Sequence, residues 1–211
     1  MSEAARLRVV DGPLSRQKLA VLRDENTPTP EFRQAMKELA LLLVAEATRE
    51  MPTRAVRLKT PLAKTEVERI SGPVCLIPVL RAGLGMLESA LALLPEATVG
   101  FMGLQRDKET AEPFEYYVNL PQPLDEYLVL VLDPMLATGG SLSATIGKIK
   151  EYGACWISCL HAVAAAPGIE RVVDEHWDVN LYTAAVDPEL DENAFIVPGL
   201  GDAGDRLYGT I

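Results

Sequence analysis

Residues that hold metals or form disulfide frameworks are scarce in this sequence. Its 211 residues include three cysteines and two histidines, and Cys75, Cys155 and Cys159 form no CxxC pair and no Cys/His cluster. An odd number of cysteines at this spacing fits neither a common zinc site nor a disulfide scaffold. We therefore expect three reduced, buried thiols, as is typical of a cytoplasmic protein.

Long apolar runs are also absent. No run approaches the ~20 residues that span a bilayer, and the initial MSEAARLRVV lacks the apolar segment of a secretory signal. Aromatic residues make up only 6%, but 48% hydrophobic and 24% charged residues are ordinary for a globular protein. These values exclude a disordered tail and a membrane protein. We expect a single folded domain over residues 1–211, with no membrane partner.

Basic residues are scarce in the second part of the chain. Residues 1–70 carry 13 Lys/Arg against 10 Asp/Glu, whereas residues 71–211 carry 7 against 20. This acidic body argues against nucleic acid as a partner, because gripping a duplex requires a basic face. Arg81 and Arg106 are the only basic residues between positions 70 and 107. A lone arginine is usually solvated or ion-paired, but Arg81 lies between an apolar strand and a Gly-x-Gly turn, where an idle charge is unusual.

The apolar pattern predicts strands that alternate with helices. A helix should run from Thr29, as its cap, to about Arg49, because apolar residues follow at spacings of three and four. Residues 52–70 have no clear period and are left unassigned. Further on, strands are predicted over 74–80, 98–104, 127–133, 156–164 and 179–185, and helices over 85–94, 141–152 and 168–176. This alternation predicts an α/β fold with a parallel sheet flanked by helices.

The strongest candidate site follows the most apolar strand. Asp133 ends this strand, and Thr138-Gly139-Gly140-Ser141 comes just before the next helix. In an α/β sheet ligands bind at the carboxyl ends of strands, and glycines before a helix N-terminus suit a phosphate. The loop lacks the Gly-Lys-Ser/Thr of a Walker-type site, and Asp133 is placed to bind sugar hydroxyls. The alternative is a simple turn in which Ser141 caps the helix.

The two histidines offer no obvious catalytic group. His161 lies in an apolar strand, so we expect a hydrogen-bonded core residue, and His176 ends a helix. We expect neither to form a triad with serine or cysteine.

Four ordered segments resemble one enzyme family. The stretch 133-DPMLATGGS-141 resembles the phosphoribosyl-diphosphate motif of type I phosphoribosyltransferases, in the version of the uracil phosphoribosyltransferases, where a second acidic residue is missing. The segment 78-PVLRAGLGM-86 is similar to that family's diphosphate loop, 106-RDKETAEP-113 to the start of its flap, and 197-VPGLGDAGDRLYGT-210 to its uracil-binding segment. The segment 18-KLAVLRDENTPTPEF-32 also matches its N-terminal arm. Phe195 departs from the tyrosine common at that position.

The resemblance implies a role for each segment. Arg81, Arg106 and Asp202 would be the catalytic residues, and Lys108 could join them. The phosphoribosyl-diphosphate site would contain Arg81, Arg106, Asp133, Pro134, Met135, Leu136, Ala137, Thr138, Gly139, Gly140, Ser141 and Asp202. Uracil would lie against Ile196, Gly201, Asp202 and Ala203, where small residues let the backbone approach a flat ring. Simple packing accounts equally well for Ile196.

The family also implies an architecture, with an N-terminal arm and helix over residues 1–70, a core over 71–186 and a uracil-binding hood over 187–211. The implied reaction joins uracil to 5-phosphoribosyl 1-diphosphate, giving UMP and diphosphate in pyrimidine salvage. Mg²⁺ is expected as the cofactor, brought by the diphosphate rather than held by a metal site of the protein. A homodimer or homotetramer is expected, and activation by GTP, as in some members, stays open. Two alternatives also stay open: a phosphoribosyltransferase for another base, and a nucleotide-binding regulator of pyrimidine genes with the same fold.

Overall fold

A nine-stranded sheet lies at the centre of the part of the chain that this computed structural model describes, residues 7–106 and 113–210. Its strands are β1 (Leu7–Val9), β4 (Val74–Leu80), β5 (Thr98–Val99), β6 (Phe101–Arg106), β7 (Pro113–Asn119), β8 (Leu128–Leu132), β9 (Met135–Leu136), β10 (Trp156–Ala165) and β11 (Asn180–Asp187). Their order is β1-β11-β10-β8-β4-β6-β7, with β5 beside β4 and β9 beside β10. Neighbours run parallel, except that β6 and β7 are antiparallel. The expected α/β sheet is therefore confirmed, with one antiparallel strand at its edge.

The two central strands, β4 and β8, are apolar along their whole length. Every residue of β8 is buried, and in β4 only the last residue, Leu80, is partly exposed. Strands of a parallel sheet are covered on both faces, so they show no polar alternation. This continuous apolar character made both strands predictable from the sequence.

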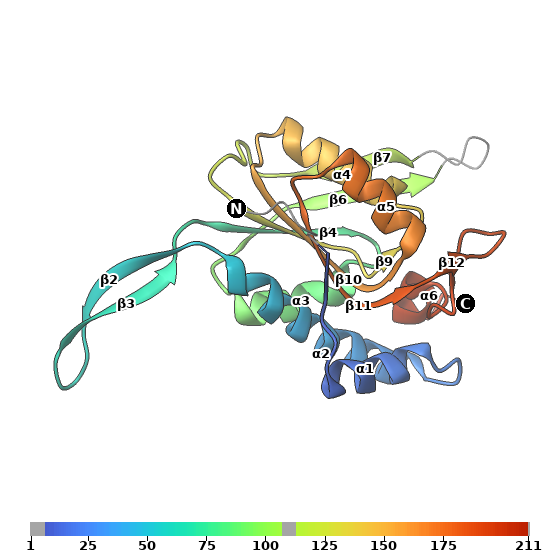
Figure 1. Cartoon of the computed structure of the whole chain (residues 1–211), viewed down its shortest axis with the longest axis horizontal. Coiled ribbons are helices and arrows are strands. Elements are labelled where there is room, and N and C mark those ends of the chain that lie inside the picture. Colours follow the sequence, from blue (N-terminus) through green and yellow to red (C-terminus); the bar gives the residue numbers. More distant parts are fainter. Residues whose placement is uncertain (1–6, 107–112, 211) are drawn as a thin grey trace.

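Helices cover both faces of the sheet (Figure 1). One face carries α1 (Pro13–Arg23), α2 (Thr29–Ala47), α3 (Leu84–Leu93) and the short α6 (Ala203–Tyr208), and the other carries α4 (Gly140–Glu151) and α5 (Ala166–Glu175). Each face has its own cluster of buried apolar residues, with Phe32 and Leu130 in the first and Ile146 and Val131 in the second. Within residues 7–106 and 113–210, no helix is long and apolar enough to cross a membrane.

The chain changes direction across the sheet between β4 and β8. It passes from β4 through α3 to β6 on one side, but from β8 through α4 to β10 on the other. At such a switch point a crevice opens outside the carboxyl ends of the two strands. Arg81 and Asp133 directly follow β4 and β8. The topology therefore brings both charged residues to the same crevice.

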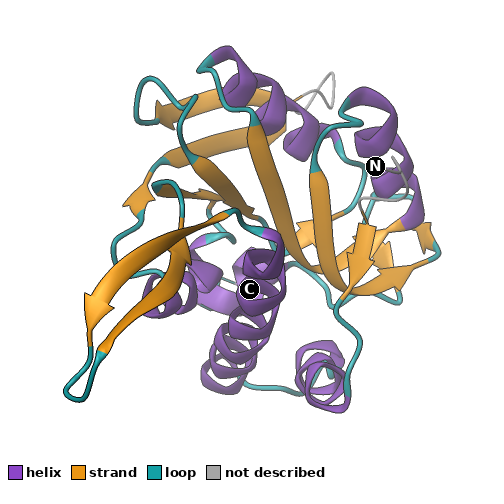
Figure 2. Cartoon of the chain, turned by 60° about the vertical axis from the view of Figure 1, so that its left-hand side comes forward, coloured by secondary structure: helices purple, strands orange, loops and turns teal. Residues whose placement is uncertain are grey.

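A two-stranded hairpin projects from the body of the molecule (Figures 1 and 2). It consists of β2 (Thr53–Lys59) and β3 (Lys64–Ile70), which pair antiparallel with Val56 opposite Val67. No residue of either strand is buried. A strand reveals itself in a sequence when one of its faces is buried, so residues 52–70 offered no period to recognise.

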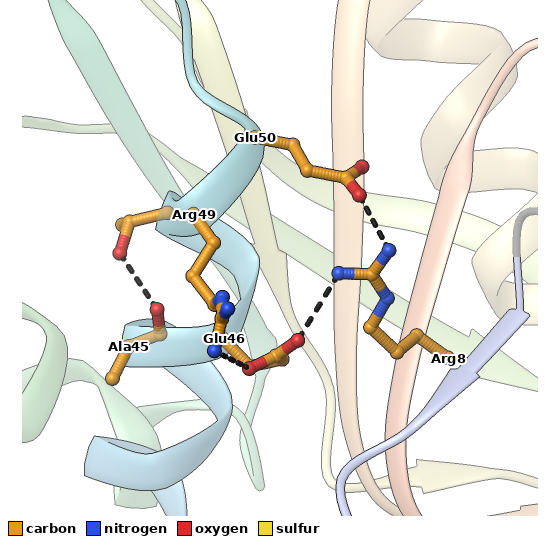
Figure 3. A network of polar contacts seen from close by, with 6 residues as sticks. Arg8, Ala45, Glu46, Arg49 and Glu50 are labelled. Atoms are coloured by element: carbon orange, nitrogen blue, oxygen red, sulfur yellow. Dashed lines mark hydrogen bonds and ion pairs between the residues drawn. The ribbon is translucent and has the colours of Figure 1, made fainter.

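A charged network joins the edge strand β1 to the end of α2 (Figure 3). Arg8 donates hydrogen bonds to Glu46 and Glu50, at 3.1 and 2.5 Å, and Arg49 lies 3.6 Å from Glu46. The 3₁₀ turn η1 (Thr48–Glu50) continues α2. The predicted end of this helix near Arg49 is therefore confirmed.

Two expectations are wrong in detail. Thr29 is the first residue of α2 rather than its cap, and Pro28 occupies the cap position without a side-chain hydrogen bond. Cys155 is exposed, whereas Cys75 and Cys159 are buried as expected. The tail after Asp187 contains α6 and the short strands β12 (Glu189–Leu190) and β13 (Ile196–Val197).

Candidate active site

Segments that are far apart in the sequence meet in one cleft of about 280 Å³. It is lined by Ala82, Met135, Ala137, Asn193, Ala194, Phe195, Ile196, Gly201, Asp202, Ala203 and Gly204. These residues follow β4, follow β8 and belong to the C-terminal segment. A larger hollow of about 730 Å³ lies at the base of the hairpin, beside Arg54, Arg69 and Leu94, and its lining includes none of the predicted site residues. The smaller cleft is therefore the candidate active site.

The loop after β8 forms one wall of this cleft and leads into α4. Gly139 is the N-cap of α4 and has a positive φ of 80°. A Cβ at this position would lie 2.9 Å from the carbonyl oxygen of Gly168 in α5, so only glycine fits without strain. A small hollow of about 40 Å³ is lined by Asp133, Met135, Leu136, Ala137, Thr138, Gly139, Ser141 and Leu142. An open helix N-terminus beside a glycine turn is suited to an anion.

Asp133 lies at the base of this loop, in surroundings that disfavour its charge. Burial raises the pKa of its carboxyl to about 7, although a hydrogen bond from the backbone N–H of Met135 opposes this shift. Its backbone carbonyl accepts a hydrogen bond from Nδ1 of His161, at 2.7 Å. His161 is fully buried, and burial lowers its pKa to about 4, so it is neutral. The expectation of a hydrogen-bonded core histidine is confirmed.

Arg81 directly follows β4, after a cis peptide bond from Leu80, and directly precedes Ala82, which lines the cleft. Its guanidinium Nη2 lies 3.5 Å from Oδ1 of Asp205, and its carbonyl accepts a hydrogen bond from the hydroxyl of Tyr208 at 3.2 Å. The side chain remains 59% exposed, so the charge is available to a ligand. The sequence analysis missed both partners, because nothing local connects positions 81 and 205.

Arg106 is the last residue of β6, opposite Pro113 of β7 in the strand register. Its backbone therefore lies at the carboxyl end of β6. Its side chain lies outside the described part of the structure. Lys108 lies outside the described residues altogether. The roles expected for both remain predictions.

The C-terminal segment closes the cleft, with all four residues expected around uracil in its lining. Ile196 and Ala203 are buried, at 5% and 2% exposure, and Asp202 caps α6 by accepting a hydrogen bond from the N–H of Asp205 at 2.9 Å. Gly201 precedes this cap, and Phe195 adds a 45% exposed ring to the same lining. The structure thus brings the predicted base segment and the loop after β8 to one cleft.

A serine, a glutamate and a histidine lie close together where α4 contacts the end of α5, without forming a catalytic triad. Ser143 of α4 lies 2.9 Å from Nε2 of His176 and donates to Glu175. In a triad the carboxylate orients the histidine, whereas here Glu175 accepts from the serine and from Arg171 at 2.9 Å. The cluster joins α4 to the end of α5, and no local pattern of residues predicted it.

The mostly parallel sheet flanked by helices has the fold of the type I phosphoribosyltransferases. A solved hypoxanthine phosphoribosyltransferase from Staphylococcus aureus has the same fold, with a TM-score of 0.51 over 80% of this chain and 85% of that one, at 10% identity. Closer similarity is found to the structure of the AQ2163 protein from Aquifex aeolicus, with a TM-score of 0.90, 35% identity, and coverage of 96% and 97%.

Sequence comparison narrows this class to one family. The profile of the family described as uracil phosphoribosyltransferase matches residues 9–210. The uracil phosphoribosyltransferase of Symbiobacterium thermophilum is 49% identical over 207 residues, 98% of this chain and 99% of that relative. The enzyme of the same name from Streptococcus salivarius is 45% identical over 206 residues, covering 97% and 99%. The chain belongs to the uracil phosphoribosyltransferase family.

Proposed function

We propose that this protein transfers the 5-phosphoribosyl group from 5-phosphoribosyl 1-diphosphate to N1 of uracil, producing UMP and diphosphate. The observation that carries the proposal is the cleft shared by the loop after β8 and residues 196–204. One wall suits a phosphorylated sugar and the other suits a flat base. Family membership supports uracil as the base, and UMP formation is a step of pyrimidine salvage.

The phosphate end of the substrate is assigned to the loop from Asp133 to Ser141. Backbone N–H groups before α4, with the hydroxyls of Thr138 and Ser141, would hold the 5-phosphate. Gly139 keeps the turn tight enough for this. Asp133, several residues earlier, would accept hydrogen bonds from ribose hydroxyls. Binding both ends of the ribose phosphate orients its anomeric carbon toward the base.

The diphosphate end is assigned to Arg81 and Arg106. As N1 of uracil bonds to the anomeric carbon, the bond from that carbon to the diphosphate oxygen breaks and its electron pair leaves with the diphosphate. The proton of N1 passes to water. Negative charge then grows on the leaving oxygens, where the planar fork of Arg81 can donate to two of them. Orientation and charge stabilisation would account for most of the rate.

The base end is assigned to Ile196, Gly201, Asp202 and Ala203. The carbonyl and N–H groups of uracil would pair with backbone groups of this segment, which the small side chains leave accessible. Asp202 accepts a hydrogen bond from the N–H of Asp205, whose carboxylate lies 3.5 Å from the guanidinium of Arg81. It would therefore also border the diphosphate.

Mg²⁺ fits the chemistry of the cleft only together with the substrate. The carboxylates of Asp133, Asp202 and Asp205 are hard oxygen ligands of the kind that Mg²⁺ prefers. Among the described residues, however, no group of three or more His, Cys, Asp or Glu side chains could hold a metal ion. We infer that the ion is bound mainly by the diphosphate oxygens, whose charge it would neutralise.

We further infer that the protein works as a homo-oligomer in the cytoplasm. The hairpin supports the first point, because an isolated two-stranded hairpin is marginally stable in water. Residues 53–70 carry five basic and two acidic residues, which complements the acidic body of a second copy.

The free thiols of Cys75, Cys155 and Cys159 support a reducing compartment. Activation by GTP stays a prediction, which adding GTP to the assay tests.

Formation of UMP tests the proposed function directly. Purified protein with uracil, 5-phosphoribosyl 1-diphosphate and Mg²⁺ should release UMP and diphosphate in equal amounts, and omission of Mg²⁺ should abolish turnover. A protein that binds UMP but forms none would instead support the regulatory alternative.

A further inference from the structure

An ion pair joins the end of α1 to the start of the C-terminal segment. Arg23 is the last residue of α1 and Asp187 the last residue of β11. The pair is bidentate, with Nη1 to Oδ2 at 2.8 Å and Nη2 to Oδ1 at 2.7 Å. The Asp187 side chain is only 6% exposed and that of Arg23 27%. A carboxylate this buried depends on its partner, since an unpaired buried charge is costly.

The same ion pair holds both polar backbone groups of Gly199. The N–H of Gly199 donates to Oδ2 of Asp187 at 2.8 Å, and its carbonyl accepts from Nη1 of Arg23 at 2.8 Å. Gly199 has a φ of 57°, and a Cβ there would lie 2.0 Å from the carbonyl oxygen of Ile196. It lies two residues before Gly201, where the cleft lining resumes after Ile196. Arg23 and Asp187 therefore determine the path of the chain between these lining residues.

A second arginine strengthens the same junction from the other side. Arg206 of α6 donates to the carbonyls of Leu200 at 2.9 Å and Asp24 at 2.6 Å, and also to that of Leu22. Its guanidinium lies 4.3 Å from the centre of the Phe32 ring. Carbonyls at the end of α1 lack partners within the helix, so the C-terminal segment supplies a donor for them. The N-terminal helices and the base-binding segment are thus joined by arginines from both sides.

We propose that Arg23 and Asp187 are positioning residues of the uracil subsite, which act through the backbone of Gly199. Neither lines the cleft. By holding Gly199 at both backbone groups, they keep Gly201, Asp202 and Ala203 in the arrangement that pairs with the base. The inference rests on the proposed function, because it takes this segment as the place where uracil binds.

The expected consequence is specific to one substrate. Recognition by backbone groups requires an ordered loop, because ordering it at the moment of binding reduces the affinity. The loop from Asp133 to Ser141 is built instead on β8 and α4, whereas the side chains of Arg23 and Asp187 bond to each other and to the backbone of Gly199. Loss of the ion pair should weaken uracil binding and leave phosphoribosyl-diphosphate binding unchanged.

Kinetics of R23Q and D187N test this split, with R16Q as the matched control. Arg16 also lies in α1 and forms a bidentate pair, with Asp11 at 2.6 Å for both contacts, but that pair is 69% and 48% exposed. We expect the KM for uracil to rise roughly 10- to 100-fold in R23Q and D187N and to stay unchanged in R16Q. Calorimetric titration with 5-phosphoribosyl 1-diphosphate should give the same Kd in all variants. R23K should restore uracil KM only in part, because an ammonium lacks the planar fork.

Hydrogen exchange separates failure of this inference from failure of the proposed function. In R23Q, amides of residues 195–205 should exchange faster than in R16Q, whatever base the enzyme uses. Unchanged exchange there, an unchanged KM for uracil, or equal weakening of both substrates would each overturn the inference, and R23K serves for these tests if R23Q does not fold. If the exchange rises but wild-type protein never forms UMP, the proposed function fails and the inferred positioning of the loop still holds.

Discussion

The side chains of Arg81 and Asp133 differ in how deeply they are buried. Arg81 remains mostly exposed although Asp205 lies nearby, so a ligand can recruit its guanidinium without breaking a strong bond. Asp133 lies deeper, and burial raises the pKa of its carboxyl to about 7. Substitution of Arg81 should therefore change turnover, whereas substitution of Asp133 should change the dependence of stability on pH.

Replacing Arg81 tests its role at the leaving group. We expect Arg81→Ala to lower kcat roughly 10²- to 10³-fold, as for the loss of other preorganised donors to a developing negative charge. Arg81→Lys should recover part of this, because it restores the charge without the fork. Steady-state kinetics at saturating uracil and Mg²⁺ measure both, with Arg16→Ala on the far helix α1 as the control. A folded Arg81→Ala enzyme with normal kcat would remove Arg81 from the mechanism.

Replacing Asp133 tests its raised pKa. An unfolded carboxyl titrates near pH 4 and the folded one near 7, so the folded protein binds more protons between these values and loses stability as the pH rises through them. Asp133→Asn removes this loss. Its Tm relative to the wild type should therefore increase from about pH 4 to about pH 7, by roughly 2–4 °C for each kcal/mol relieved.

The exposed Asp125→Asn serves as the control for this series, because it replaces a surface carboxylate by the same amide. Thermal melts across the pH range measure all three proteins. A constant Tm difference for Asp133→Asn would mean that its carboxyl titrates normally. Asp133→Asn should also bind 5-phosphoribosyl 1-diphosphate more weakly than the wild type, because an amide is a poorer acceptor for ribose hydroxyls.

Among the elements, the β2–β3 hairpin leaves apolar side chains in contact with water. Val56, Leu58 and Val67 are only partly buried, and Leu62 at the tip is 96% exposed. Side chains two apart share a face of a strand, so Val56 and Leu58 lie on one face, with Val67 opposite Val56. A second copy that covers this face would remove the apolar surface from water.

Charges placed on this face should separate the copies. We expect V56D/V67D to elute as a folded species of the monomer mass of 22.9 kDa, while the wild type forms a dimer or tetramer. Arg57→Gln removes one of the five basic charges of the hairpin from the opposite face, where Arg57 is 91% exposed beside Glu66, and should leave the assembly largely intact. Light scattering coupled to gel filtration measures the masses. A wild-type monomer, or an unaltered V56D/V67D assembly, would contradict the role assigned to the hairpin.

At the scale of the whole molecule, the central sheet belongs to a fold shared with other phosphoribosyltransferases, and we propose that the C-terminal segment selects the base. A hypoxanthine phosphoribosyltransferase shares the fold at 10% identity, so the fold alone is compatible with more than one base. Ile196 and residues 201–204 line the cleft in which we propose that the base binds. Small residues and backbone groups there suit a single ring.

The choice of base is therefore predicted from this segment. Uracil should be used roughly 10²-fold better than cytosine or hypoxanthine, as judged by kcat/KM, because a mismatched base leaves buried donors or acceptors unpaired. A panel of bases with 5-phosphoribosyl 1-diphosphate and Mg²⁺ measures this. Faster turnover of hypoxanthine or guanine than of uracil would contradict the assignment.

Local sequence determined those features whose physical cause is local. A strand buried on both faces is a continuous apolar run, which located β4 and β8 to within one residue at each end. The glycines at the start of α4 and the charged residues after the two strands also lie in short segments of the sequence. Together with the parallel fold they place Arg81 and Asp133 at one crevice. Most of the central sheet and two walls of the cleft could be predicted in this way.

Tertiary structure alone decided what depends on distant partners or on burial. The hairpin has no buried face, so no period marks it. Arg23 and Asp187 are 164 residues apart, and Arg81 and Asp205 are 124 apart, so no spacing rule connects either pair. The raised pKa of Asp133 arises from the depth at which it is buried. Such properties come from the free energy of packing distant segments against one another, which a local pattern of residues does not contain.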